Sequence, residues 1–399
     1  MLAAVIPSGP VAGRRVAVTG LGALSCAGVG VEALWDALQR DVAPSSKRVA
    51  PFDASHLGGP KELRRLDPFA LYALVAADEA WRQSGLSGPI LDAGSIVTTG
   101  IGGLQTVLEQ VRVLNEKGPD RVSPFMVPMM MPNAATAAVS MRYGLGGPCE
   151  TVTTACAAGT HAIGNAARLI ATGRCTVAVA GGAEAVMVPI AEAGFHNMTA
   201  LSNQDLSRPF DLNRDGFVMG EGAGILVLEE WDHAVARGAT ILAEVIGAAS
   251  TADAHHITAP DPSGHGAIRC MELALADAGI KVSDVSHVNA HGTSTPLNDL
   301  AESVAMHQVF GPDVPPVTSI KGHLGHSLAA AGALEGVASV RTLLAQVIPP
   351  TAGTTDVDPA VDLDLVIGAP RPTRIEVILS NSFGFGGHNG SVVFRRVGS

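Results

Sequence analysis

The feature that most constrains the fold is an alternation of short apolar strands with helices rich in alanine and glycine. Residues 150–155 have the β-branched pattern of a strand, residues 157–172 that of a helix, and residues 175–180 that of the next strand. Strands that are apolar on both faces are typically buried between helices, and strand–helix–strand succession is typical of a parallel sheet. The sequence therefore predicts an α/β protein with a mostly parallel, buried sheet.

The same alternation continues along most of the chain. Further strands are expected over residues 16–19, 95–99, 225–229, 243–246, 285–290, 375–380 and 391–395, and further helices over residues 71–83, 267–278 and 328–345. The first strand is expected to end at Gly20-Leu-Gly22. The Met- and Pro-rich residues 118–134 are expected to form a loop packed against apolar surface.

No low-complexity linker divides the 399 residues, so the chain is expected to pack as one body of two halves. We place the N-terminal half at residues 14–239 and the C-terminal half at residues 240–399. The preceding tail, residues 1–13, lacks the basic start of a signal peptide.

The composition limits the partners of the protein. Apolar residues make up 47% of the chain and charged residues 16%. A monomer with so few charges would leave apolar surface in water, so an oligomer is expected. The net charge of −11 argues against nucleic-acid binding, which needs a basic face. No apolar run reaches the ~18 residues of a membrane-spanning helix, so no membrane partner is expected.

The cysteines indicate a reducing compartment. The chain has five of them, scattered and without a CxxC pair, so neither a disulfide scaffold nor a zinc knuckle is expected. A cytoplasmic location fits this pattern best. The five are Cys26, Cys149, Cys156, Cys175 and Cys270.

Cys156 is the first candidate for chemistry. It follows a predicted strand and precedes a helix of small residues, Ala157-Ala-Gly-Thr160. A thiol at a helix N-terminus is expected to have a lowered pKa, and the small neighbours leave room for an acyl chain. A buried structural cysteine is the alternative, and on this element alone the two are about equally favoured. The other cysteines are interpreted as structural.

Two further segments carry histidines at the ends of predicted elements. In Asn289-Ala-His291-Gly-Thr-Ser-Thr295, a strand delivers His291 into a loop of small residues. In Lys321-Gly-His-Leu-Gly-His326, the last histidine lies near a helix N-terminus, where the positive end of the dipole disfavours imidazolium. Loop capping is the alternative for His291. The spacing of His323 and His326 lacks a third ligand, so no metal site is predicted.

The fourth segment is the Gly-rich run Asn381-Ser-Phe-Gly-Phe-Gly-Gly-His-Asn389. Glycines allow the backbone to approach a ligand and to point N–H groups at it, although an isolated run of this kind is more often a tight turn. Together the four segments supply one thiol, two imidazoles and one ammonium. Thioester carbon–carbon chemistry needs this set, because a thiolate accepts an acyl group and two neutral histidines can stabilise an enolate oxygen.

At these four segments the sequence resembles the elongating β-ketoacyl-acyl-carrier-protein synthases, the synthase II-like branch of the thiolase superfamily. The resemblance extends from Val16-Ala-Val-Thr-Gly-Leu-Gly22 to the Gly-rich run. It implies a thiolase-like fold with two pseudo-symmetric halves, each with a mixed sheet between helices, in a five-layered α-β-α-β-α arrangement. Related chain-starting enzymes use Cys-His-Asn and thiolases use a second cysteine, so the second histidine indicates a decarboxylating elongator.

The resemblance also implies roles for individual residues. Cys156 would accept the acyl group, His291 and His326 would promote decarboxylation of malonyl-acyl-carrier protein, and Lys321 would support His326. The amides of Cys156 and Phe385 would form an oxyanion hole, with Phe385 also gating the pocket. Other substrate-binding positions would be Phe195, Ile101, Phe383, Gly384, Gly386, Thr293 and Thr295. Glu335 would pair with Lys321, and Asp299 and Glu302 would lie behind the site.

The family further implies a carrier protein as partner and no cofactor, because the substrates arrive on the carrier's phosphopantetheine arm. Lys61, Arg64 and Arg65 form a basic cluster that would attract this acidic partner; a solvated helix face is the alternative. Thr199 stands where family members often have a basic residue, and His388 replaces a common threonine in the Gly-rich loop. These departures from the family pattern concern partner choice and gating.

Three functions remain open at this point. The chain is a homodimeric elongation synthase of fatty acid or polyketide synthesis, or the active half of a heterodimer with a cysteine-lacking chain-length subunit. The third is a non-catalytic module that binds carrier proteins, against which the intact Cys156 argues. The Met-rich residues 126–131 are a candidate for the subunit seam and the pocket floor.

Overall fold

The computed structural model describes residues 13–398, and in this part of the chain one mixed sheet of 11 strands organises the fold. The strand order is β4-β3-β5-β6-β1-β7-β13-β12-β8-β9, with β2 paired to β1. The strands of this sheet are β1 Val16–Ser25, β2 Gly28–Val29, β3 Ala93–Thr98, β4 Cys149–Glu150, β5 Val177–Glu184, β6 Gly222–Glu230, β7 Ala243–Ala252, β8 His287–Asn289, β9 Val317–Thr318, β12 Val377–Gly384 and β13 His388–Arg395.

The sheet consists of two half-sheets with the same plan. The first follows the order β1, β6, β5, β3, β4, and the second the order β7, β13, β12, β8, β9. In each half the first two pairings are antiparallel and the last two are parallel. The halves join where β1 pairs with β7. The expected pseudo-symmetric halves are confirmed.

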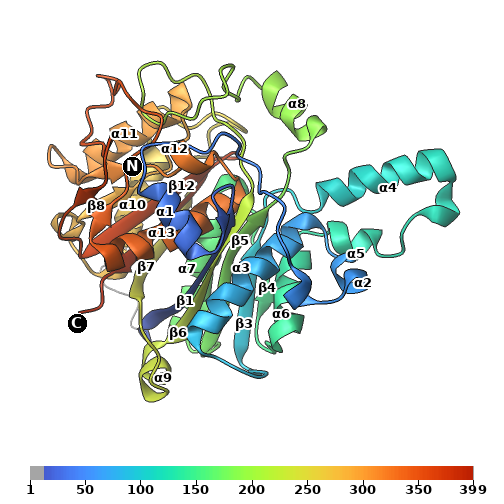
Figure 1. Cartoon of the computed structure of the whole chain (residues 1–399). Helices are drawn as coiled ribbons and strands as arrows, with labels where there is room; N and C mark the ends of the chain where they lie inside the picture. The colour runs from blue at the N-terminus through green and yellow to red at the C-terminus, as the bar shows by residue number, and fades with distance from the viewer. Residues whose placement is uncertain (1–12, 399) are drawn as a thin grey trace.

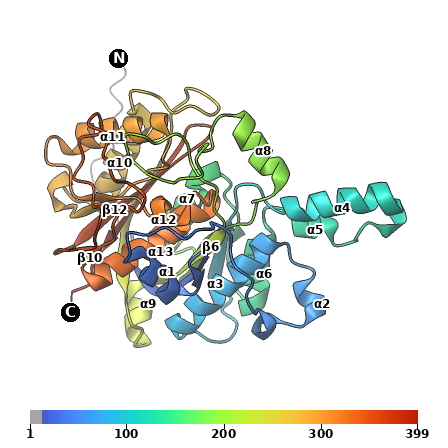
Figure 2. The ribbon, with the colours of Figure 1, turned by 45° about the horizontal axis from the view of Figure 1, so that its top comes forward.

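Helices fill the space between the half-sheets and cover their outer faces (Figures 1 and 2). The helices α7 (Ala158–Ala171) and α13 (Ala329–Ala345) contact each other and both half-sheets. One outer layer contains α3 (Pro68–Ser84) and α6 (Ala134–Tyr143); the other contains α10 (His265–Ala278) and α11 (Pro296–Phe310). The expected five layers are therefore present.

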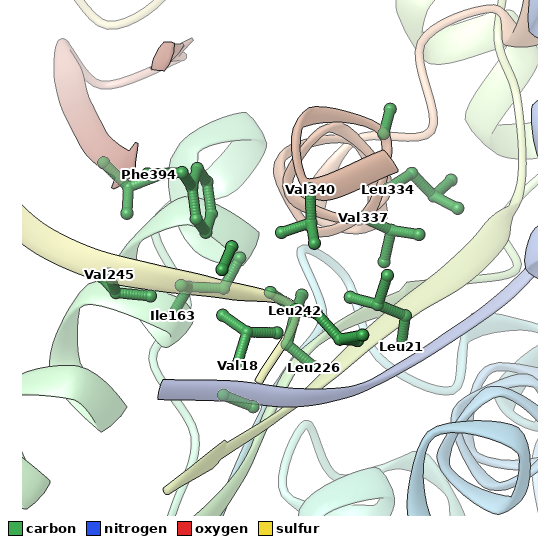
Figure 3. Close-up of a cluster of buried hydrophobic side chains, with 14 of the residues drawn as sticks. Val18, Leu21, Ile163, Leu226, Leu242, Val245, Leu334, Val337, Val340 and Phe394 are labelled. Atoms are coloured by element: carbon green, nitrogen blue, oxygen red, sulfur yellow. The ribbon is translucent and has the colours of Figure 1, made fainter. Parts of the chain in front are cut away.

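The core lies where the central helices meet the sheet (Figure 3). Val18 and Leu226 of the sheet face Val337 and Val340 of α13, and all four side chains are buried. Because α13 is buried on nearly every side, small residues are needed along it. The Ala- and Gly-rich composition that predicted this helix is thus a packing requirement.

Gly20 and Gly22 lie inside strand β1, so the prediction that the strand ends there is wrong. A Cβ atom at Gly20 would lie 2.1 Å from the carbonyl oxygen of Ala80, and one at Gly22 would lie 1.8 Å from that of Ala76. Both carbonyls belong to α3. The two glycines therefore allow this helix to pack directly on the strand.

Two expectations drawn from the local sequence pattern are wrong. The sheet is not mostly parallel, because the antiparallel strands β6 and β13 separate the parallel parts from the centre. The mixed sheet that the resemblance implies is confirmed. The strand expected over residues 150–155 is reduced to β4, and residues 155–157 form the 3₁₀ turn η3 (Ala155–Ala157). Beyond β4 the Thr151 hydroxyl donates to the backbone oxygen of Val97 at 3.1 Å, and the Thr154 hydroxyl lies 2.6 Å from Nδ1 of His161.

The Met-rich segment forms part of a projecting arm (Figures 1 and 2). The arm consists of α4 (Leu104–Lys117), η2 (Pro119–Arg121) and α5 (Met126–Met130). The segment is therefore not the loop predicted. Phe125, Val127 and Met131 are exposed, so residues 13–398 leave this apolar surface uncovered.

The remaining elements connect these layers. They are α1 Val31–Leu38, η1 Ser55–Leu57, α2 Pro60–Leu63, α8 Pro189–Asn197, α9 Trp231–Ala236, η4 Val282–Asp284, α12 Lys321–Leu324 and the two-stranded sheet of β10 Val347–Ile348 with β11 Arg371–Pro372. No helix in residues 13–398 is both long and apolar enough to span a bilayer. All but the last residue of the expected N-terminal tail, residues 1–13, lies outside the described residues.

Candidate active site

Cys156 lies at the middle of η3, directly before α7, and its side chain is buried. The preceding Ala155 has a φ of +49°, a left-handed conformation that residues with a Cβ rarely adopt. Such strain is maintained only where the surroundings impose it, and it is common at functional sites. The turn directs the thiol toward the second half of the molecule.

The thiol of Cys156 is not acidified as the helix position predicted. Burial raises its pKa to about 11, while the Phe385 amide and the charge of Lys321 lower the pKa by less than burial raises it. The expectation of a lowered pKa is therefore wrong, because desolvation of the thiolate outweighs both of these stabilising contributions. The resting nucleophile is a neutral thiol.

His291 and His326 meet in front of this thiol. Their ring centroids are 5.3 Å apart and the rings are nearly perpendicular. His291 follows β8, and His326 lies in the turn between α12 and α13. Burial, followed by the charge of Lys321, keeps the pKa of each imidazole well below its ordinary value. Both rings are therefore neutral near pH 7 and able to donate a hydrogen bond.

Lys321 lies against His291 and pairs with Glu335. Its Nζ lies 3.3 Å from Nδ1 of His291 and donates to the backbone oxygen of that residue at 2.6 Å. It also forms a buried ion pair with Glu335, which in turn accepts from Ser382 at 3.4 Å. Lys321 thus contacts His291 directly, whereas it acts on His326 through its charge.

The contact from Lys321 determines the tautomer of His291. An ammonium has three donors and no acceptor, so Nδ1 of the neutral ring must be the acceptor. The ring proton is then on Nε2. This arrangement leaves an Nε2–H donor for a ligand.

Asp299 and Glu302 shape the loop that carries His291. Glu302 accepts the amides of His291 and Gly292 at 2.7 and 2.8 Å, and Asp299 accepts those of Thr293 and Ser294 at 2.9 and 3.1 Å. Burial raises the pKa of Glu302 to about 8. Both carboxyl groups act from behind the loop on its backbone.

The Gly-rich loop closes the other side of the thiol. Gly384 lies so close that a Cβ there would be 3.0 Å from the amide nitrogen of Cys156. Phe383 packs edge-on to His291 at 5.8 Å, and Phe385 lies 6.4 Å from Phe195. The backbone amides near the sulfur are therefore accessible only because residue 384 has no side chain.

One cavity of about 350 Å³ connects these groups to the surface. Its lining includes Cys156, His291, His326, Phe383, Gly384, Phe385, Thr293 and Thr295. The hydroxyls of Thr293 and Thr295 lie 2.9 Å apart. The four chain segments singled out in the sequence thus converge on a single space.

Three expected pocket residues lie outside this lining. Phe195 packs against Phe217 and Phe385. Ile101 is 40% exposed. The amide of Gly386 donates to the backbone oxygen of Ile257. The structure therefore does not bring these residues into the open cavity.

The basic cluster is exposed but lies away from the cavity mouth. Lys61 is on α2, with Arg64 and Arg65 just after it. Arg65 lies over the ring of Phe125 at 4.3 Å, which connects the cluster to the arm. Figures 1 and 2 both place α2 beside α5 and far from α11. Of the two divergent positions, Thr199 lines the cavity and His388 starts β13.

Two residues at the site were missed in the sequence. Glu184 ends β5, is buried, and accepts from Thr99 and Gly100, both at 2.8 Å. Phe217 packs edge-on to His326 at 5.3 Å. A carboxylate directly after an apolar strand, in Gly181-Gly-Ala-Glu184, is the same signal that identified His291. Phe217 has no comparable signal.

Neutral imidazoles, a buried thiol and inward amides suit chemistry in which negative charge develops on oxygen. Within residues 13–398 no three His, Cys, Asp or Glu side chains gather as a metal site would require. What the site offers chemically is one nucleophile and several hydrogen-bond donors.

Comparison with solved structures gives the same fold. The chain aligns over 97% of its length with the ishigamide ketosynthase/chain length factor, at a TM-score of 0.91 and 32% identity, covering 100% of that chain. It aligns equally far with a type II PKS acyl-carrier protein in complex with its ketosynthase, at a TM-score of 0.89 and 33% identity, again covering 100% of that chain. These likenesses support the thiolase-like arrangement of the two halves.

Comparison with characterised sequences extends over almost the whole chain. A 3-oxoacyl-[acyl-carrier-protein] synthase 2 of Synechocystis sp. is 43% identical, over 96% of this chain and 98% of that protein. A protein of the same name from Rhizobium meliloti is 42% identical, over 96% of this chain and 99% of that protein. Residues 41–234 match the beta-ketoacyl synthase N-terminal domain and residues 242–355 its C-terminal domain. The chain therefore belongs to the β-ketoacyl synthase family.

Proposed function

We propose that the protein catalyses a decarboxylative Claisen condensation, in which an acyl group on Cys156 is joined to a malonyl unit to give a 3-ketoacyl thioester. The observation that carries this proposal is the meeting of Cys156 with two neutral imidazoles in one cavity. A thiol hydrolase would need one histidine as base and would have no use for a second neutral donor.

The first step is acyl transfer. The Cys156 sulfur attacks the incoming thioester, the old C–S bond breaks, and the thiol proton ends on the departing carrier thiol. Because the thiol is neutral at rest, its proton is lost only as the attack proceeds. The oxyanion formed on the acyl carbonyl accepts hydrogen bonds from the amides of Cys156 and Phe385.

The second step uses the malonyl thioester. Loss of CO₂ leaves an electron pair as an enolate, whose oxygen accepts hydrogen bonds from the Nε2–H groups of His291 and His326. The enolate carbon attacks the acyl carbon, and the C–S bond to Cys156 breaks. The released thiolate then takes up a proton. Lys321 keeps the His291 tautomer that this step requires.

The substrates are proposed to arrive on the phosphopantetheine arm of an acyl carrier protein, without a further cofactor. Thr293 and Thr295 line the cavity and are suitable donors for the amides of such an arm. The exposed cluster Lys61, Arg64 and Arg65 supports long-range attraction of an acidic carrier. The free cysteines of the described chain support a cytoplasmic location.

A dimer is proposed as the working form. Phe125, Val127 and Met131 leave apolar surface exposed on the arm, which a second subunit would cover. A similar solved protein is described as a ketosynthase/chain length factor, which favours a heterodimer as the second possibility. Light scattering of the purified chain distinguishes a stable homodimer from a subunit that needs a different partner.

The experiment that tests this function is reconstitution with acyl- and malonyl-carrier protein. We expect a 3-ketoacyl product from the native chain and none from Cys156→Gln, which should still release CO₂ from malonyl-carrier protein. Cys175→Ala is a matched control, since that thiol is buried elsewhere. Absence of product with every acyl group offered would refute the proposal, and a carrier complex without turnover would leave a scaffolding role.

A further inference from the structure

Helix α11 carries an exposed apolar stripe that begins at the mouth of the cavity. Leu297 is 64% exposed, Leu300 41% and Val304 36%. Residues three and seven positions apart lie on one face of a helix, so the three side chains form a continuous row. Leu297 also lines the cavity that contains Cys156. The row therefore leads outward from the active site.

The opposite rim has the same apolar character. Met198 lines the cavity and is 44% exposed. The ionisable carboxyl groups of the lining are Asp215, Asp253, Asp261 and Glu302, and no lysine or arginine of the described chain is among the lining residues. Among the residues that line the cavity, an acidic carrier would therefore find apolar side chains and carboxylates, and no lysine or arginine.

We infer that Met198 and the α11 stripe form the seat of the acyl carrier protein, which contacts them with apolar side chains that surround the attachment point of its arm. This inference rests on the proposed function. The arm is covalently attached to the carrier and must enter this mouth to reach Cys156, so the carrier surface next to the arm has to lie on the rim. Long-range attraction by the α2 cluster and apolar seating at the rim are separate contributions.

Two variants of Leu300 with opposite charges distinguish apolar contact with the carrier from charge pairing with it. We would measure the Kd for malonyl-carrier protein by calorimetry, and kcat/KM with carrier-bound and with pantetheine-bound malonyl and acyl thioesters. Leu300→Glu, Leu300→Lys and Val304→Glu should each weaken carrier binding about fivefold or more. Turnover of the pantetheine thioesters should stay within about twofold, because neither residue lines the cavity.

Leu344→Glu is the matched control. Leu344 is 46% exposed, comparable to Leu300, and lies near the far end of α13, roughly 23 Å along the helix from its first residue. The Kd of the Leu344→Glu variant for the carrier should equal that of the native chain.

Three results would overturn the inference. Tighter carrier binding by Leu300→Lys would show that charge governs the contact. A change of molar mass in Leu300→Glu would show that the stripe is a subunit interface. Equal loss with carrier and pantetheine substrates would show that the stripe only supports the site. Failure of the proposed function can be told apart from failure of this inference. If the proposed function is wrong, the native chain shows no turnover, but the Kd values of the native chain and the variants for the carrier can still be compared.

Discussion

Nζ of Lys321 lies 3.3 Å from Nδ1 of His291, and this contact sets which nitrogen of the ring carries the proton. Both groups belong to the second half of the molecule, whereas Cys156 lies in the turn η3 before α7 of the first half. The active site thus lies between two halves of equal plan, one of which supplies the nucleophile and the other the donors.

Breaking the Lys321–Glu335 ion pair should harm both stability and activity. Lys321→Met leaves the buried carboxylate of Glu335 unpaired, which should cost about 3–5 kcal/mol in the free energy of unfolding. Urea unfolding measures this loss. The double variant Lys321→Met with Glu335→Gln should recover most of the stability but little condensation, because His291 still lacks its partner. Recovery of both would contradict the assigned role.

Alkylation of Cys156 should keep accelerating with pH. Since burial raises its pKa to about 11, the thiolate fraction should grow about tenfold per pH unit between pH 7 and 9. The measurement is the rate of iodoacetamide labelling of the Cys156 peptide by mass spectrometry, with Cys156→Ala as the blank. A plateau near pH 7 would mean that the helix N-terminus dominates after all.

Acid should destabilise the fold through buried neutral histidines. Burial lowers the pKa of His287 to about 3, so below about pH 6.5 the unfolded chain binds a proton that the folded chain excludes. Stability is therefore lost as pH falls, by about 2–3 kcal/mol between pH 7 and 4.5 for this residue. In urea unfolding at pH 7 and at pH 4.5, the His287→Leu variant should lose less stability between the two pH values than the native chain, by this amount. An unchanged pH dependence in the variant would show that His287 is solvated.

A methyl group at residue 384 should obstruct the oxyanion site. In Gly384→Ala the added carbon would lie 3.0 Å from the Cys156 amide nitrogen, in the space that the oxyanion needs. Condensation should fall about 10²- to 10³-fold, while iodoacetamide labelling of Cys156 stays within a fewfold. Gly194→Ala is the comparison, because Gly194 lies outside the cavity lining and an added Cβ there would meet no atom within 4 Å. Equal losses in labelling and condensation would indicate a displaced thiol.

The sequence was most informative where a residue capable of chemistry precedes small residues. Cys156 and His291 are both followed by such residues, and both line one cavity together with His326. The five layers followed from the resemblance, not from periodicity. Strand polarity was mispredicted because a fully buried antiparallel strand such as β6 is as apolar as a parallel one.

Other errors have physical causes that local patterns do not contain. Gly20 and Gly22 resembled a strand end, but the approach of α3 requires them within the strand. The pKa of Cys156 depends on burial in the folded chain and on Phe385 and Lys321, which lie more than 150 residues away in sequence. Glu184 was overlooked because a lone carboxylate after a strand is also typical of a solvated turn.

The most direct test of the central claim is mass spectrometry of the intact chain and its peptides after incubation with a panel of acyl-carrier proteins. We predict one acyl group per chain, on Cys156, that is released as 3-ketoacyl-carrier protein when malonyl-carrier protein is added. No acyl group on Cys156, or one that persists after malonyl addition in the native chain, would contradict the account.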